Sequence, residues 1–281
     1  VEDNGIGYHE KKLGQQFCDH SAKDLLAMLL QQAQIAGVQI KTRVEVQRVQ
    51  SAQGGGFEVA SSEHSFYADK VVLASGGLSM PKISSDLAFR TARQFALRVE
   101  ETSPALVPLT WNNTDRGRFA HLSGVSLPAI VSCRGATFCE DILFTHRGLS
   151  GPGILQISSY WAPGDAIEID LLPDIDAFEW LVAFQNSSPK SRVASLLQTR
   201  LPKRLVHQLI GMWFDDGRIG EVSHRDLRKL ADSLHRWILK PGGTEGYRTA
   251  EVTLGGVATD AVSSKTFEVK KLPGLYIIGE A

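Results

Sequence analysis

Three apolar segments of this sequence end in glycine, and this recurring pattern constrains the fold more than any other feature. The segments are VVLASGG (71–77), VTLGGVATD (252–260) and LYIIGEA (275–281). Apolar runs that end in small residues predict buried strands whose ends let backbone approach a ligand closely. In open α/β sheets, ligands bind beyond the carboxyl ends of the strands. We therefore expect the three strand ends to converge on one sheet edge and to form an extended cleft.

Each strand end also has a simpler interpretation. A Gly-Gly pair after a strand can be a tight turn that needs positive φ and binds nothing. A single strand end leaves both interpretations open, whereas three of them in one chain favour the cleft.

The remaining pattern predicts an α/β domain interrupted by an insert. Ser21 and Asp24 form a capping pattern ahead of a helix that ends near Gly37. A second helix is expected over 86–97, and strands are expected over 38–40, 44–50 and 57–60. The segment from 107 to 170 contains strand patterns and a helix that opens near Pro152. Apolar residues then recur at helical spacing from 176 to 240, through Trp237 and Ile238, before strand patterns return.

These patterns suggest three domains. Residues 1–107 and 250–281 form a discontinuous α/β domain. Residues 108–175 and 241–249 form a β-rich insert, and residues 176–240 form a helical insert.

Composition excludes several classes of protein. The 281 residues are 43% hydrophobic and 22% charged, which is typical of a globular protein. No apolar run approaches the roughly 18 residues of a membrane span, and a net charge of -1 gives no general attraction to nucleic acid or to a membrane. The three cysteines, Cys18, Cys133 and Cys139, fit neither a disulfide framework nor a zinc pattern and suit structural thiols in the cytoplasm.

Two further stretches could carry function. His146 and Arg147 lie among glycines before a predicted helix start, where free N–H groups can hold an anion. The residues alone favour the alternative, a solvated loop with Ser150 as a helix cap. Five cations without an intervening acid lie between 189 and 204, namely Lys190, Arg192, Arg200, Lys203 and Arg204. A solvated helix face is the expected interpretation of this run, and an RNA-binding surface is the alternative.

The segments around VVLASGGLSMP, FTHRGLSGPGILQ and LGGVATDAVSSKT resemble one bacterial family of FAD-dependent flavoproteins that includes aminoacetone oxidase and a bile-acid dehydro reductase. The resemblance runs from about residue 8 to residue 281. It implies that residues 1–107 and 250–281 form a partial glutathione-reductase-like, Rossmann-like FAD-binding domain, with a β-barrel-like piece and a helical piece inserted. It also implies an oxidoreductase that acts on a small organic substrate by hydride transfer to or from the flavin.

The resemblance assigns roles residue by residue. Glu45 and Val46 would pass the adenine end of FAD. The other implied cofactor contacts are Ala74, Ser75, Gly76, Gly77, Gly255, Gly256, Gly279 and Glu280. His146 and Arg147 would lie on the substrate side. NAD(P)H is a possible electron donor, and no metal, nucleic acid or membrane is expected.

This chain departs from the family in two important respects. No Gly-x-Gly-x-x-Gly fingerprint follows a strand, and the segment expected beyond Gly279-Glu280 is absent from the sequence. The chain is therefore interpreted as a fragment that binds FAD weakly and is inactive alone. The alternative is a shortened, non-catalytic paralogue whose insert acts as a binding module. Neither the substrate nor the oligomeric state follows from the sequence.

Overall fold

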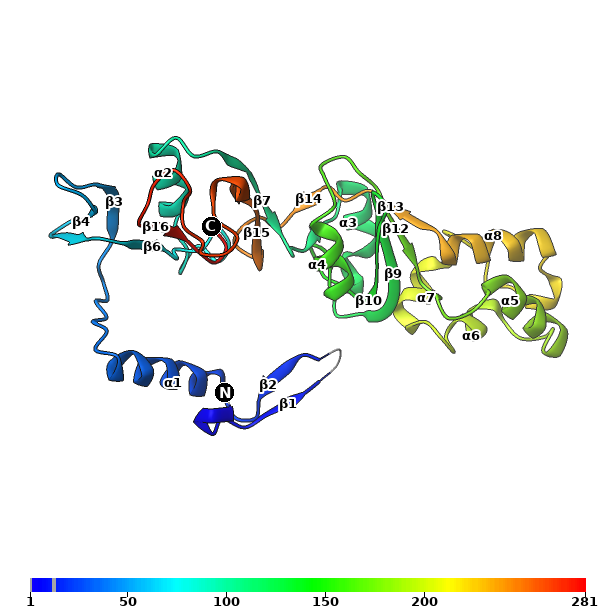
Figure 1. Cartoon of the computed structure of the whole chain (residues 1–281). Coiled ribbons are helices and arrows are strands. Elements are labelled where there is room, and N and C mark those ends of the chain that lie inside the picture. Colours follow the sequence, from blue (N-terminus) through cyan, green and yellow to red (C-terminus); the bar gives the residue numbers. More distant parts are fainter. Residues whose placement is uncertain (1, 12–13) are drawn as a thin grey trace. The chain divides into compact units, whose positions relative to one another are not determined.

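The structure is a computed structural model that describes residues 2–11 and 14–281, and Figure 1 labels its elements. These residues form two compact units, Val1–Gln47 with Ala60–Ser65 and Arg48–Val59 with Phe66–Ala281. The first unit contains η1 (Glu2–Asn4), β1 (Tyr8–Glu10), β2 (Gln16–Cys18) and α1 (Ala22–Ile35). A mixed α/β architecture is thereby confirmed for the described chain.

Helix α1 begins where the capping pattern predicts. Ser21 has extended backbone angles, and its hydroxyl accepts a hydrogen bond from the Lys23 amide at 3.2 Å. The strand expected over 38–40 is wrong, because this segment is irregular and both Val38 and Ile40 are exposed. Two β-branched residues favour extended backbone, but a strand also needs a hydrogen-bonded neighbour.

Three strands follow in a small sheet, β3 (Val46–Ser51), β4 (Phe57–Ser61) and β5 (Ser65–Ala68), in the order β3-β4-β5. The glycine-rich turn between β3 and β4 forms as expected. The Ala52 amide donates to the Gly56 carbonyl at 3.0 Å.

The glycine-ended strands pair with partners that are distant in sequence. Strand β6 (Val71–Leu73) pairs in parallel with β16 (Leu275–Ile277), and β7 (Val99–Ala105) pairs antiparallel with β15 (Val252–Val257). Helix α2 (Leu87–Gln94) lies between β6 and β7 in the chain, and the 3-10 turn η4 (Thr259–Ala261) lies between β15 and β16. The chain thus returns, after about 150 residues of insert, to pair with the strands it left.

The insert is built on an antiparallel sheet of seven strands. Its order is β13-β12-β9-β10-β11-β8-β14. The strands are β8 (Leu109–Thr110), β9 (Ser126–Cys133), β10 (Ala136–Phe144), β11 (Gly148–Ser150), β12 (Ile167–Asp170), β13 (Trp237–Leu239) and β14 (Gly243–Thr244). Helix α3 (Asn113–Phe119), turn η2 (Ala120–Leu122) and helix α4 (Pro152–Ser158) connect them. Pro152 occupies the first turn of α4, as predicted.

The pairing of β9 with β10 follows from alternation and turn chemistry. Leu127, Ala129 and Val131 are buried and alternate with more exposed residues. Arg134 and Gly135 both have positive φ in the two-residue connection to β10. Such a pair is typical of a type I′ hairpin turn, which matches the twist of the strands.

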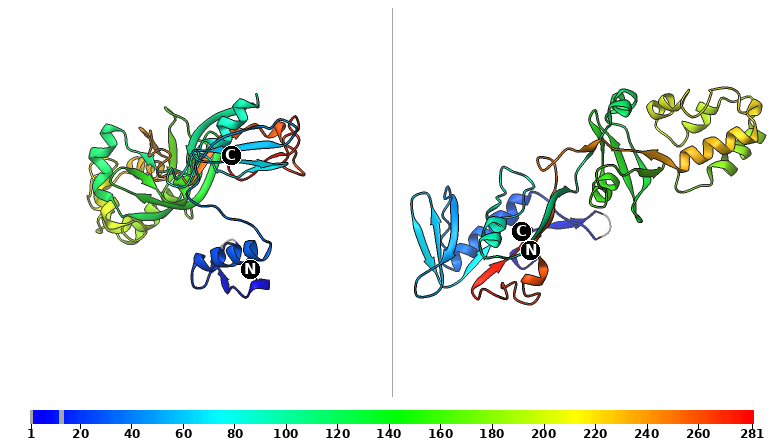
Figure 2. Two further views of the ribbon diagram at one scale, coloured as in Figure 1. Left: turned by 90° about the vertical axis from the view of Figure 1, so that its left-hand side faces the viewer. Right: turned by 90° about the horizontal axis from the view of Figure 1, so that it is seen from above.

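The helical piece is interrupted more often than its periodicity suggests. It contains α5 (Ala177–Ser187), α6 (Val193–Leu197), α7 (Lys203–Leu209), η3 (Ile219–Glu221) and α8 (His224–His235). The expectation of a continuous helical pattern through Ile238 is wrong, because Trp237–Leu239 is strand β13 and pairs with β12. Figure 2, in its right-hand view, shows α5 and α8 beside each other, in agreement with their many close residue pairs.

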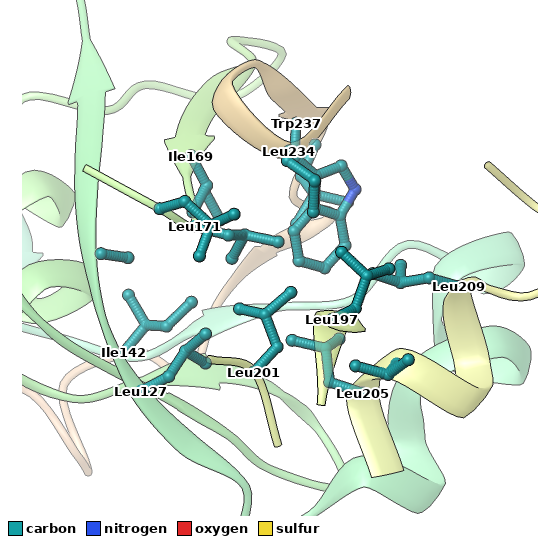
Figure 3. Packing of buried hydrophobic residues seen from close by; sticks show 14 of the residues in the cluster. Leu127, Ile142, Ile169, Leu171, Leu197, Leu201, Leu205, Leu209, Leu234 and Trp237 are labelled. Carbon is teal, nitrogen blue, oxygen red and sulfur yellow. The ribbon is translucent and has the colours of Figure 1, made fainter. Parts of the chain in front are cut away.

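One hydrophobic core joins the seven-stranded sheet to these helices. Ile142 and Ile169 of the sheet lie close to Leu197, Leu205 and Leu234 of the helical piece in Figure 3, and all five are buried. Full burial of one such side chain contributes about 1.5–3 kcal/mol. The two parts of the insert therefore stabilise each other as one body.

Candidate functional site

The structure brings the ends of β6 and β16 together. The two strands are parallel neighbours, and the Ile278 amide donates to the Leu73 carbonyl at 3.0 Å. The segments 74–77 and 278–280 therefore leave the sheet side by side, at its carboxyl edge. This is the edge at which ligands bind in open α/β sheets.

A buried network ties the third glycine-ended strand to this edge. The Thr253 hydroxyl accepts hydrogen bonds from the Leu78 and Ser79 amides at 2.8 and 3.0 Å. The Ser79 and Thr253 hydroxyls are 2.8 Å apart, and both residues are buried. The Glu280 carboxylate accepts from the Thr253 amide and lies 3.5 Å from the Ser79 hydroxyl. Thr253 thus joins all three segments, which we call the glycine edge (74–79, 252–257 and 278–281).

The glycines of the glycine edge serve two different purposes. A Cβ on Gly77 would lie 2.5 Å from the Thr253 Oγ1 atom, so Gly77 is required for packing. Gly76 and Gly279 both have positive φ, and a Cβ on either would meet nothing within 4 Å. These two positions leave open space beside the backbone, as a bound ligand requires.

Gly255 and Gly256 lie at a bulge in β15. The register of β15 against β7 shifts between Leu254 and Gly256, and a Cβ on Gly255 would overlap the Glu101 carbonyl. Gly256 approaches Ala281, whose carbonyl carbon would lie 3.0 Å from an added Cβ. The bulge therefore places β15 against the last residues of the glycine edge.

A cavity of about 340 Å³ borders the glycine edge. Gly279 and Ala281 line it on one side, Val257 lines it on another, and Ser263 and Phe267 complete the wall. Ligand pockets in proteins commonly measure about 300–1,000 Å³. The cavity is large enough for one flat ring system.

Ser75 has a role in the fold. Its hydroxyl accepts a hydrogen bond from the Ala88 amide at 3.3 Å, in the first turn of α2. Of the other predicted cofactor contacts, Ala74 lies at the glycine edge, Val46 begins β3, and Glu45 is exposed in the first unit.

His146 and Arg147 occupy the turn between β10 and β11. The Thr145 hydroxyl accepts from the Arg147 and Gly148 amides, and the Arg147 guanidinium lies 3.6 Å from the Glu245 carboxylate. His146 is exposed. The structure places this pair in the seven-stranded sheet, whereas the glycine edge is built from β6, β15 and β16.

The described residues contain no group of three or more His, Cys, Asp or Glu side chains arranged to hold a metal ion. Cys133 is buried in the core, and burial, with the nearby Asp165 carboxylate, raises the pKa of its thiol. Within residues 2–11 and 14–281, none of the helices has the length and apolar character needed to cross a bilayer.

Sequence reasoning overlooked Ser79 and Thr253, the residues that hold the edge together. The one available signal was Thr253, a polar residue inside an apolar strand pattern. Its partners lie 174 and 27 positions away, so no local pattern reveals them.

A glycine-edged parallel strand pair, interrupted by an antiparallel sheet with attached helices, defines the class: a mixed α/β protein with a composite insert. The chain belongs to the HI0933-like protein family. The family model described as HI0933-like protein barrel and H2TH domain matches residues 103–252, which include the seven-stranded sheet and helices α5–α8.

Relatives with names support this membership. The chain is 43% identical to the ribosomal RNA dihydrouridine synthase of Escherichia coli (strain K12), over 100% of this chain and 70% of the relative. The protein of the same name from Haemophilus influenzae is 41% identical over 100% of this chain and 71% of the relative. The 3-dehydro-bile acid delta(4,6)-reductase of Clostridium scindens is 27% identical over 92% and 66%. The family thus includes enzymes of the oxidoreductase type.

These findings correct the resemblance drawn from the sequence. A grouping with aminoacetone oxidase and the bile-acid reductase is wrong, because the bile-acid enzyme is a distant relative and the two closer ones carry another name. The physical reason lies in the segments used. FTHRGLSGPG, for example, forms a turn, β11 and the start of α4. Related proteins share such structural elements whatever substrate they bind.

The expectation that no nucleic acid takes part is also wrong. Two relatives are named for ribosomal RNA, and the matched family model includes an H2TH domain. The net charge of -1 on which the expectation rested is a sum over the whole chain. Such a sum carries no information about local basic surfaces.

Proposed function

We propose that this protein is a flavin-dependent enzyme that reduces uridine to dihydrouridine in ribosomal RNA. Its support is the 43% and 41% identity, over the whole of this chain, with two enzymes named for that product. The glycine edge adds a place for a flat cofactor. FAD as the particular flavin, NAD(P)H as the electron donor and the cytoplasm as the location are parts of the same proposal.

The names of the relatives share one kind of chemistry. Conversion of uridine to dihydrouridine saturates a carbon–carbon double bond conjugated with a carbonyl group. The name of the bile-acid enzyme also describes reduction of double bonds near an oxidised carbon. Both reactions add a hydride to one carbon and a proton to its neighbour, and a bound reduced flavin supplies the hydride.

The residues of the glycine edge fit a flavin on structural grounds. Open space beside Gly76 and Gly279 lets a ring or a pyrophosphate approach the backbone, and the 340 Å³ cavity adjoins Gly279. Ala74, Gly255 and Gly256 would border the cofactor. Glu280 would hold the backbone of the glycine edge in place for the cofactor, since its carboxylate is bound to Thr253 and Ser79.

Two earlier expectations stay within this proposal. Glu45 and Val46 remain candidates for the adenine end of FAD, and Ser75 for a cofactor contact. Arg147, fixed by Glu245, and the exposed His146 remain candidates for polar groups near the substrate. The glutathione-reductase-like form of the cofactor domain and the three domain boundaries stay predictions.

The test is the dihydrouridine content of ribosomal RNA in living cells. A bacterial strain that lacks its own ribosomal RNA dihydrouridine synthase receives the complete gene that contains this chain. Mass spectrometry of the digested RNA should show dihydrouridine restored. Ribosomal RNA that stays free of dihydrouridine, although the protein is folded and abundant, would contradict the proposal.

The 281-residue chain expressed by itself tests the fragment hypothesis. If the complete gene restores dihydrouridine and the 281-residue chain does not, the result agrees with an inactive fragment. A non-catalytic paralogue would restore nothing in either form.

A further inference from the structure

A cavity of about 300 Å³ lies where the seven-stranded sheet meets the helical piece. Arg118 of α3 lines it, together with Trp213 after α7, and Ser233 and Arg236 at the end of α8. Exposed Met212 and Ile238 extend its rim. The lining thus combines two guanidinium groups and an aromatic ring with one carboxylate, that of Asp115.

The two guanidinium groups retain unused hydrogen-bond donors. The Arg118 and Arg236 side chains are 54% and 72% exposed. Each forms one ion pair, Arg118 with Asp115 at 3.9 Å and Arg236 with Glu168 at 3.4 Å, and this pairing uses only part of its five N–H donors. Guanidinium groups present five N–H donors in a geometry that matches phosphate.

Trp213 is held in place by the core. Its ring centroid lies 5.6 Å from that of Trp237 at an interplanar angle of 82°, and Trp237 stacks on Phe144 at 6.0 Å. Trp237 is buried and Trp213 is half-buried. The Trp213 ring is therefore a rigid aromatic surface at the cavity wall, and such surfaces stack with unpaired bases.

Further cations lead toward the cavity along α8. Arg225 and Lys229 lie on the same face of α8 as Ser233 and Arg236, at spacings of four and three residues, and Leu230 and Leu234 are buried on the opposite face. Lys229 also forms an ion pair with Asp226 at 2.8 Å. A rise of 1.5 Å per residue puts Lys229 about 6 Å from Arg225 and about 10 Å from Arg236 along the axis. Arg225, Lys229 and Arg236 belong to α8 and its C-terminal end, and Arg118 of α3 lines the same cavity as Arg236. We call these four residues the α8 stripe.

The basic run singled out in the sequence is used mostly by the fold. Arg192 pairs with Asp216 at 2.7 Å, Arg204 donates to the Ser123 and His121 carbonyls, and Arg200 lies over Trp180. Lys190 and Lys203 are exposed. They therefore provide matched control positions on the same helical piece.

We propose that the 300 Å³ cavity binds an unpaired nucleotide of RNA, with the base against Trp213 and flanking phosphates on the α8 stripe. The inference rests on the proposed function and names the surface that receives the RNA. The aromatic wall distinguishes a nucleotide from other anions, for which cations alone would suffice.

The test is the affinity of the full protein for a fluorescein-labelled, uridine-rich single-stranded RNA of twelve nucleotides, measured by anisotropy at several salt concentrations. R118A/R236A should raise the Kd about tenfold or more at low salt. It should also lower the slope of log K against log salt by about 1.4, since each single-strand phosphate contact contributes about 0.7. K190A/K203A, which removes the same charge, should leave both the Kd and the slope nearly unchanged.

Trp213 is tested by W213L and W213F. Loss of base stacking in W213L should raise the Kd roughly tenfold, whereas W213F retains an aromatic face and should bind nearly as wild type. Thermal unfolding of each variant shows whether the fold persists. If W213L unfolds, the comparison of R118A/R236A with K190A/K203A still tests whether the cavity binds RNA.

The inference is overturned if R118A/R236A and K190A/K203A weaken binding equally, or if polyglutamate competes as well as unlabelled RNA. Its failure is distinct from failure of the proposed function. A wild-type protein that forms dihydrouridine in ribosomal RNA, with R118A/R236A equally active and equally tight, refutes only the cavity. A wild type that forms none refutes the function.

Discussion

At the residue scale, Thr253 shows how one hydroxyl can organise a site. It accepts from two buried amides and contacts the Ser79 hydroxyl, while its own amide donates to Glu280. A buried N–H group that loses its acceptor costs free energy because water cannot replace the partner. The glycine edge therefore depends on a residue that need not touch the ligand.

Thr253→Val removes the hydroxyl and keeps the shape of the side chain. We expect the free energy of unfolding to fall by roughly 1–3 kcal/mol, because the Leu78 and Ser79 amides lose their acceptor. Thr253→Ser keeps the hydroxyl and serves as the control in urea unfolding. Equal stability of the two variants would show that the network contributes nothing.

Tyr247 offers the opposite case. Its hydroxyl is buried and has no hydrogen-bond partner within the described part of the chain. Tyr247→Phe removes this unsatisfied group, so the free energy of unfolding should rise by about 1 kcal/mol. A loss of stability in the same urea measurement would mean that the hydroxyl is satisfied in solution.

At the element scale, one histidine joins three elements of the insert. The His235 Nε2 atom at the end of α8 accepts from the Ala177 amide in the first turn of α5 at 3.0 Å, so its Nδ1 carries the proton and donates to Asp170 of β12 at 2.9 Å. His235→Phe should lower the free energy of unfolding by about 1–3 kcal/mol, since both contacts are lost.

His224→Phe, on the same helix, is the matched control. His224 is exposed and meets Phe178 edge-on, a contact that phenylalanine retains. Its effect should remain within about 0.5 kcal/mol, as for most surface substitutions. Equal losses in the two variants would contradict a specific role for His235.

Asp216 makes the helical piece sensitive to acid. Burial acts to raise the pKa of its carboxyl, but hydrogen bonds from the Ala194 amide and the Arg192 guanidinium outweigh burial and hold the pKa below the usual 3.8. A carboxyl with a lowered folded-state pKa stabilises the fold fully above pH 3.8 and loses that contribution as the pH falls through its folded-state pKa.

Asp216→Asn should therefore cost stability at neutral pH, and the difference from wild type should shrink below pH 3.8. Unfolding curves recorded across the acid range measure this difference. A gap that stays constant down to the lowest pH at which the protein folds would exclude a role for the Asp216 charge.

At the scale of the whole molecule, local signals in the sequence predicted local structure well. Ser21 predicts the start of α1 and Pro152 that of α4. Two of the three glycine-ended runs correctly indicated strands that end together, β6 and β16. The third expectation was wrong, because Gly255 and Gly256 form a bulge inside β15, which continues to Val257. The mixed α/β class could also be predicted, because it follows from the helices and strands that local signals indicate.

Features that depend on distant partners could not be predicted from one sequence. Trp237–Leu239 has helical periodicity but forms a strand because β12 offers a free edge. Val38 and Ile40 lack such a partner and form no strand. The expectation that no nucleic acid takes part was wrong because it rested on the net charge, which does not depend on where the charges lie.

The most direct test of the account follows the cofactor and the RNA in one reaction. The protein expressed from its complete gene is loaded with flavin, reduced without oxygen and mixed with ribosomal RNA that contains unmodified uridine. We expect the oxidised flavin absorbance to return in a single turnover, with one dihydrouridine formed per flavin. Flavin that stays reduced in the presence of this RNA would contradict the account.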